Sequence, residues 1–187
     1  MAVEVDDSLI GRLRDRFPNA EIVHANVLEV NLAQWGTAAV AGNLPYYITS
    51  PIIEKILAMG PLCRRAALLV QKEVALRITA LPRSRDFGYL SVMVQSQAEA
   101  KLLFDVPPSA FQPPPKVDSA VVLLTPSRTP SGGFLRFASA CFRQKRKTLR
   151  NNLLAEYPRI EGQPEASLRA EQLSAADLEA LYLRVTA

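Results

Sequence analysis

The chain has 187 residues, of which 49% are hydrophobic and 21% charged, and its formal net charge is +4. This composition excludes a wholly disordered, collagen-like or low-complexity chain, and the length predicts one main domain with a small appendage. No apolar run reaches the ~18–20 residues that span a bilayer, and the start of the chain lacks the basic-then-apolar order of a signal peptide. We therefore expect a cytoplasmic globular protein with no membrane contact.

Few residues are available for metal binding or nucleophilic catalysis. The two cysteines, Cys63 and Cys141, are too few and too far apart for a disulfide framework or a zinc motif. The single histidine, His24, disfavours a multi-histidine metal site and would have to serve any Ser/His/Asp catalysis alone. We expect no metal site.

Strands and helices alternate in the first two thirds of the chain. The apolar spacing predicts a strand at 2–6, a helix at 7–17, strands at 21–25 and 38–42, and a helix between Pro51 and Gly60. A strand at 66–70, helices at 72–80 and 89–96, and β-rich runs at 99–106 and 117–124 follow. The uninterrupted apolar run at 66–70 is typical of a strand covered on both faces. The alternation predicts βαβ units and a mostly parallel sheet, with the last two strands as a hairpin-like edge.

The last third of the chain is predicted to be helical. A linker-like stretch at 126–133 precedes expected helices at 134–144, 147–155 and 174–184. Ser174 is a good N-cap for the last of these, because an acid stands three residues later. The sequence therefore predicts an α/β domain at 1–126 and a small helical domain at 131–187.

Positive charge is concentrated in one short segment. Between Phe134 and Arg150 there are six basic residues and no acid, so this segment carries +6 and the rest of the chain −2. The six are Arg136, Arg143, Lys145, Arg146, Lys147 and Arg150. A solvated helix face is the more common explanation of such a run in a generic protein. A phosphate-contacting surface is the functional alternative.

The most informative short motif is Asn43-Leu44-Pro45-Tyr46, which follows the predicted strand at 38–42. In open α/β sheets, ligands bind outside the carboxyl ends of strands. Asn43 offers a carbonyl acceptor, Pro45 stiffens the loop, and Tyr46 offers a flat ring. The four residues suit a planar base with an exocyclic amine, although they are also compatible with an ordinary turn.

Longer motifs occur in a characteristic order along the chain. They are N-L-P-Y-Y-I-T-S-P-I-I from Asn43, L-L-V-Q-K-E-V-A-L-R from Leu68, P-P-S-A-F-Q-P-P-P-K-V-D-S-A-V-V from Pro107, and F-R-Q-K-R-K-T-L-R-N-N-L from Phe142. From Val3 to about Leu183 the chain resembles the KsgA (RsmA) family of small-subunit rRNA adenine-N6,N6-dimethyltransferases. The erythromycin-resistance rRNA methylases share the Asn-Leu-Pro-Tyr box, but the proline-rich box and the Arg-Lys-Thr-Leu-Arg-Asn helix favour the KsgA branch.

The resemblance implies a fold and a reaction. The fold is a Rossmann-like, S-adenosylmethionine-dependent methyltransferase sheet with a small C-terminal helical domain. The reaction is dimethylation of adenine N6 in small-subunit rRNA within a 30S-type particle. Asn43, with the carbonyl of Leu44 or Pro45, would accept the two N6 hydrogens and direct the amine at the methyl group. Tyr46 and Phe111 would sandwich the extruded adenine.

The same resemblance assigns cofactor and RNA contacts. Glu4 matches the acid that binds the ribose hydroxyls of S-adenosylmethionine, and Asn43 also borders the cofactor. Lys116 and the basic residues at 143–150 would contact rRNA phosphates. His24, Cys63 and Cys141 have no part in this scheme and are assigned to packing.

Two departures from the family pattern concern the cofactor. Asn26 stands where the family has an aspartate for the cofactor's adenine, which keeps an acceptor but loses the charge. The family's glycine-rich loop should precede Glu4, and the chain begins three residues before Glu4. We therefore expect the first strand of the sheet to be missing, cofactor binding to be weakened or lost, and the exposed sheet edge to favour self-association.

Three functions remain open from the sequence. The chain is the main part of a KsgA-type enzyme, active or as an inactive fragment. It could instead be a non-catalytic rRNA- or ribosome-binding protein that keeps the base pocket without the cofactor. The third alternative is the antibiotic-resistance activity on large-subunit rRNA.

Overall fold

The computed structural model describes residues 1–187, and the predicted strands and helices are all present with shifted ends. The strands are β1 (Ala2–Glu4), β2 (Ile22–His24), β3 (Ala38–Asn43), β4 (Cys63–Gln71), β5 (Ala98–Val106) and β6 (Ser119–Pro126). The helices are α1 (Asp7–Arg16), α2 (Thr49–Leu57), α3 (Lys72–Thr79), α4 (Tyr89–Gln95), α5 (Gly132–Cys141), α6 (Leu149–Leu153) and α7 (Ala175–Thr186). No helix combines the length and the apolarity that crossing a membrane requires.

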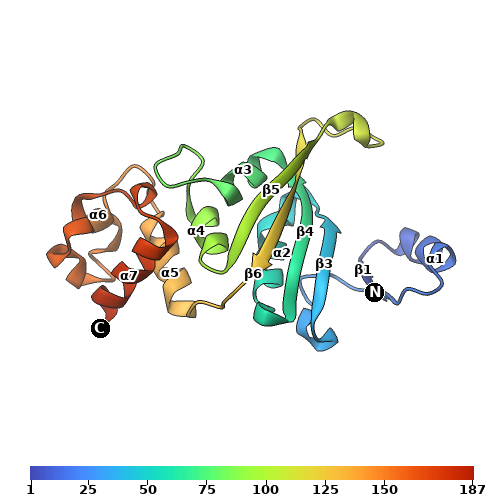
Figure 1. Cartoon of the computed structure of the whole chain (residues 1–187), viewed down its shortest axis with the longest axis horizontal. Coiled ribbons are helices and arrows are strands. Elements are labelled where there is room, and N and C mark those ends of the chain that lie inside the picture. The colour runs from blue at the N-terminus through green and yellow to red at the C-terminus, as the bar shows by residue number, and fades with distance from the viewer.

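The strands form two separate sheets. The larger one has the order β3-β4-β6-β5, with β3 parallel to β4 and with β6 antiparallel to both of its neighbours. β1 and β2 form a parallel pair of their own, which lies beyond β3 together with α1 (Figure 1). The expectation of a mostly parallel sheet is wrong for the larger one, because β6 returns from the β5 hairpin and inserts beside β4. The predicted hairpin-like edge is confirmed.

Helices cover one face of the larger sheet. Figure 1 places α2, α3 and α4 on the same side of it, and they enclose a core of 18 buried residues. Along β4, Ala66, Leu68 and Val70 are fully buried, whereas Ala67 and Leu69 are only half-buried. The apolar run at 66–70 therefore does not lie in a strand covered on both faces, because no helix packs on the second face.

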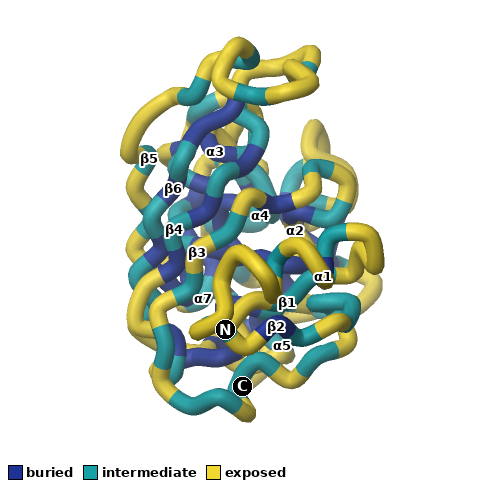
Figure 2. The backbone as a smooth tube through the Cα atoms, turned by 90° about the vertical axis from the view of Figure 1, so that its right-hand side faces the viewer, coloured by how far each residue is buried: buried dark blue, intermediate teal, exposed yellow.

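The N-terminal strand pair is the least buried part of the chain. Among residues 1–25 only Ile10 and Ile22 are buried. Figure 2 shows this contrast between the largely exposed α1 region and the buried stretches of β4, β6 and α4. The pair is thus held to the rest of the molecule by few apolar contacts.

A second core of 17 buried residues lies among α5, α6 and α7. It also includes Ala80, Phe87 and Val92 from the α3–α4 region, so the helical part packs against α4. The predicted cap of α7 is confirmed: Ser174 Oγ accepts from Asp177 N at 3.1 Å, and Ser174 Oγ and N both donate to Asp177 Oδ2. These hydrogen bonds, first that from the hydroxyl, lower the pKa of Asp177. The division of the chain at 126–131 remains a prediction.

The part of the basic segment that carries most of its charge, residues 142–148, does not form a helix. Residues 142–148 form a non-helical connection between α5 and α6. The helix predicted at 134–144 therefore ends earlier, at Cys141, and the helix predicted at 147–155 begins later, at Leu149. Asn152 caps the break, because its buried amide donates to the carbonyls of Cys141 (2.9 Å) and Gln144 (3.2 Å). The helical basic patch expected from the sequence is therefore a basic turn.

Candidate active site

The ends of four strands meet at one edge of the larger sheet. Asn43 is the last residue of β3, Gln71 of β4 and Val106 of β5, while Ser119 is the first residue of the antiparallel β6. Ser119 is paired with both Gln71 and Val106. Leu44 N donates to Leu69 O at 3.0 Å and extends the β3–β4 ladder by one residue. The Asn43–Tyr46 loop therefore leaves the sheet where the strands converge.

Two neighbouring acceptors in this loop are unused. Pro45 is extended (φ −62°, ψ 125°), and its carbonyl accepts from Ile48 N and Thr49 Oγ1, both at 3.2 Å. The carbonyl of Leu44 accepts no hydrogen bond, and the exposed side-chain amide of Asn43 makes none. The geometry thus distinguishes Leu44 from Pro45, which the sequence could not.

The ring of Tyr46 is fixed at its hydroxyl end. Tyr46 Oη lies 2.6 Å from Ser119 Oγ, and Ser119 is fully buried. The next residue, Tyr47, is 86% exposed. Phe111 follows a short turn at Pro108–Ala110, is half-buried, and contacts no other ring. The role of Ser119 had no signal in the sequence, because it depends on a contact across 73 residues.

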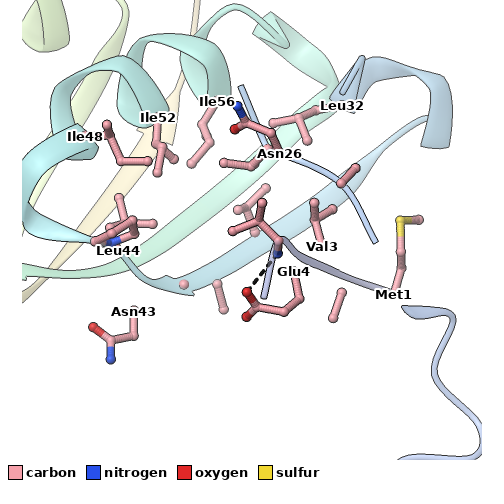
Figure 3. Close-up of a pocket in the computed structure, with 18 of the residues that line it drawn as sticks. Met1, Val3, Glu4, Asn26, Leu32, Asn43, Leu44, Ile48, Ile52 and Ile56 are labelled. Carbon is pink, nitrogen blue, oxygen red and sulfur yellow. Dashed lines mark hydrogen bonds between the residues drawn. The ribbon is translucent and has the colours of Figure 1, made fainter. Parts of the chain in front are cut away.

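A largely apolar cavity of about 510 Å³ lies between β1 and β3. All three predicted cofactor residues, Glu4, Asn26 and Asn43, line it. Trp35 and Tyr47, which had no predicted role, line it as well. Figure 3 shows Ile52 and Ile56 across the cavity from Glu4. Tyr46 does not line the cavity; its neighbour Tyr47 does. The structure therefore brings together the predicted cofactor residues, which come from three separate segments.

The polar side chains of this cavity differ in how many hydrogen-bond acceptor positions they have free. Glu4 Oε1 accepts from the amides of Val5 (2.8 Å) and Asp6 (2.9 Å), and Oε2 accepts nothing. Asn26 is used locally: its Oδ1 accepts from Leu28 N at 3.0 Å, and its Nδ2 donates to Glu29. A carbonyl oxygen has two lone pairs, so Asn26 retains one acceptor position. Glu4 has a whole oxygen available.

Of the three residues assigned to packing, the two cysteines are buried and the histidine is not. Cys63 and Cys141 are buried, as expected. The His24 side chain is 43% exposed, lies 3.4 Å from Asp7 Oδ1, and places Nε2 3.2 Å from the carbonyl of Val5. The packing assignment of His24 is therefore wrong, because the β1–β2 pair is too thinly covered to bury it. No cluster of three or more potential metal ligands occurs.

Ion pairs divide the predicted RNA-binding residues into two groups. Arg143 pairs with Glu156, Arg150 with Glu161, and Lys145 with Glu171 at 3.7 Å. Arg146, Lys147 and Lys116 are exposed and form no ion pair. The unpaired group has its full charge available to an outside partner.

A mixed α/β sheet with an apolar cavity beside β3, lined by an acid and two amides, has the form of a Rossmann-like ligand site, and the comparisons identify the class as S-adenosylmethionine-dependent methyltransferases. The family model described as ribosomal RNA adenine dimethylase matches residues 1–179, and the chain belongs to this family. It is 38% identical to the ribosomal RNA small subunit methyltransferase A of Prosthecochloris aestuarii, over 98% of this chain and 74% of that protein. The predicted family is confirmed.

Solved structures support the same fold. A dimethyladenosine transferase from Plasmodium falciparum superposes with a TM-score of 0.81 at 24% identity, covering 98% of this chain and 78% of that one. The 23S rRNA methyltransferase ErmE gives a TM-score of 0.65 at 29% identity, covering 99% and 81%. The first of these likenesses concerns the fold alone.

Proposed function

We propose that the protein transfers methyl groups from S-adenosylmethionine to adenine N6 in small-subunit rRNA, yielding N6,N6-dimethyladenosine during ribosome biogenesis. The adjacent free acceptors of Asn43 and Leu44, at the mouth of the cavity, carry this proposal. Family membership and the relative from Prosthecochloris aestuarii support the small subunit as the substrate. We propose that the protein acts in the cytoplasm, where such a particle is assembled.

The loop would bind adenine through its exocyclic amine. Asn43 Oδ1 accepts one N6 hydrogen and the carbonyl of Leu44 the other, because the Pro45 carbonyl already accepts two hydrogen bonds. Two acceptors in fixed positions turn the nitrogen lone pair toward the cavity, so that positioning rather than a strong base promotes transfer. Tyr46 stacks on the base, and Phe111 closes the other side.

The cavity residues fit the cofactor. The volume of the cavity lies in the range of about 300–1,000 Å³ that is usual for small-molecule sites. The free Oε2 of Glu4 suits a ribose hydroxyl, and the remaining acceptor position of Asn26 suits an amino group. Isoleucines of α2 provide an apolar wall for a purine ring. When bound, S-adenosylmethionine supplies an electrophilic methyl group. The uncharged Asn26 binds the cofactor's adenine less tightly than an aspartate would.

Residues 131–187 form an RNA-binding domain in this proposal, and residues 1–126 the methyltransferase domain. Arg146, Lys147 and Lys116 contact rRNA phosphates directly, because no acid of the chain neutralises them. Arg143, Lys145 and Arg150 contribute less, since contact with a phosphate competes with Glu156, Glu171 and Glu161.

We also propose that the chain self-associates through β3. Its hydrogen bonds reach β4 on one side, and its other edge borders the cavity without a partner strand, so a dimer formed there competes with S-adenosylmethionine for this space. Unpaired strand edges favour pairing with another chain. Sedimentation equilibrium should show a dimer at micromolar concentration; a monomer throughout would contradict this part of the proposal.

Calorimetric titration tests the cofactor directly. We expect S-adenosylmethionine to bind the wild type, and Glu4→Gln to bind it more weakly than a matched surface variant, Glu99→Gln. Absence of cofactor binding with retained binding to small ribosomal subunits would make the chain a non-catalytic rRNA-binding protein instead.

A further inference from the structure

The loop between α3 and α4, residues 80–88, contains the only non-glycine residue with a positive φ. Arg83 has φ 69° in the left-handed region, where a side chain is disfavoured and glycine or asparagine is the usual occupant. Residues held in this conformation cluster at functional sites. The backbone conformation alone does not explain why an arginine occupies this position, which points to a role for its side chain.

Three contacts fasten this loop to the helical part of the molecule. Arg83 N donates to the carbonyl of Glu171 at 2.7 Å, and Lys145 Nζ donates to the carbonyl of Arg85 at 2.6 Å. At the base of the loop, the buried ring of Phe87 lies 6.2 Å from the ring of Phe142. The two hydrogen bonds to the loop use backbone atoms of Arg83 and Arg85, so they leave both guanidinium groups free.

The loop and the basic turn at 142–148 thus adjoin each other, and both carry exposed basic residues. Arg83, Arg85, Arg146 and Lys147 are all exposed and form no ion pair. The turn residues Gln144–Lys147 line a hollow of about 310 Å³ that contains no hydrophobic residue. Three of its four lining residues are basic, which favours an anionic ligand.

Given the proposed function, we infer that the loop and the turn form one composite surface for the phosphates of the RNA backbone. Arg83 and Arg85 contact phosphates, for which the planar, multi-donor guanidinium is well suited. The left-handed backbone is retained at Arg83 because its amide anchors the loop on Glu171 while its side chain remains free. Lys145 is a positioning residue here, since its ammonium group holds the Arg85 carbonyl.

Fluorescence anisotropy with a labelled small-subunit rRNA transcript, measured over a range of salt concentrations, tests this surface. For the double variant Arg83→Gln/Arg85→Gln we expect the log–log salt slope to fall by roughly 1.4–1.8, from about 0.7–0.9 per phosphate contact. The matched control is Arg12→Gln/Arg14→Gln in α1, whose arginines are also exposed and unpaired. An unchanged slope, or an equal fall in the control, would overturn the inference.

Arg83→Gly separates an RNA contact from a structural role. Glycine adopts a positive φ without strain, so we expect the melting temperature to stay the same or rise while RNA affinity falls. A lower melting temperature with unchanged affinity would show that Arg83 serves the fold alone. Binding of the wild type to anionic vesicles in preference to RNA would also contradict the inference.

The binding assay is independent of catalysis. If the wild type methylates RNA but the Arg83/Arg85 variant keeps the wild-type slope, the composite surface is wrong and the proposed function stands. If the slope falls and no dimethyladenosine is formed, the surface stands and the proposed function is wrong.

Discussion

The phenolic oxygen of Tyr46 lies 2.6 Å from the hydroxyl oxygen of Ser119, and this hydrogen bond joins the loop after β3 to the first residue of β6. Ser119 is fully buried and its hydroxyl makes no other hydrogen bond. Stacking on a base needs the ring of Tyr46 but not its hydroxyl. We therefore attribute the hydroxyl to holding the ring in one orientation beside Asn43 and Leu44.

Removing this hydrogen bond should slow catalysis without weakening RNA binding. We expect Tyr46→Phe and Ser119→Ala each to lower kcat about tenfold, since the loss of such a bond costs on the order of 1 kcal/mol or more. KM for RNA should stay within about twofold, and the double variant should be no slower than either single one. Tyr157→Phe is the matched control, because that tyrosine packs on the core of the C-terminal helices. Additive losses would show that the two hydroxyls act separately.

Ion pairing should decide which basic residues of the turn matter most. Arg146→Gln/Lys147→Gln and Arg143→Gln/Arg150→Gln each remove two positive charges, but only the second pair is bonded to acids of the chain. We expect the first variant to lower the salt slope of RNA binding by roughly 1.4–1.8 and the second by less. Equal slopes would mean that the intramolecular ion pairs do not persist in solution.

Asn152 should stabilise both the fold and the shape of the basic turn. Asn152→Ala leaves the carbonyl of Cys141 without its side-chain donor, whereas that of Gln144 still accepts from Lys147 N; Asn152 itself is 7% exposed. We expect urea denaturation to show a loss of about 1–3 kcal/mol. Asn151→Ala, at an exposed neighbour, should change the stability by less than about 0.5 kcal/mol. A similar change in both variants would argue against the capping role.

Both cysteines should be unreactive in the folded protein. Burial raises the pKa of the Cys141 thiol far above its ordinary value, and it raises that of Cys63 as well. A raised pKa lowers the thiolate fraction at pH 8, and the thiolate is the reactive species. Titration with a disulfide reagent at pH 8 should detect no fast-reacting thiol before unfolding and two afterwards. A fast-reacting native thiol would contradict the burial.

Local patterns in the sequence were sufficient to predict the helices and strands and the Asn43–Tyr46 loop of the site. The isoleucine spacing of α2 and the Ser174–Asp177 cap depend on neighbours within one or two turns. The insertion of β6 beside β4 is different, because it pairs residues about 50 positions apart. The hydrogen bond between Tyr46 and Ser119 also joins residues far apart in the sequence, so no local pattern predicts it.

The basic segment shows the limit more sharply. The sequence predicts a helix up to residue 144, yet α5 ends at Cys141, whose carbonyl accepts from the amide of Asn152, 11 residues away. The acids that neutralise Arg143 and Arg150 lie 13 and 11 residues further along the chain. Charge content could therefore be predicted from the sequence, whereas the charge available to a partner required the fold.

Nucleoside analysis of the reaction product tests the central claim most directly. Unmodified small ribosomal subunits would be incubated with S-adenosylmethionine and the protein, digested to nucleosides, and analysed by mass spectrometry. We predict N6,N6-dimethyladenosine with the wild type and a yield at least about 100-fold lower with Asn43→Ala, which loses an acceptor aimed at the reacting amine. Asn19→Ala, at an exposed turn, should behave as the wild type. Absence of dimethyladenosine with the wild type, or wild-type yields with Asn43→Ala, would contradict the account.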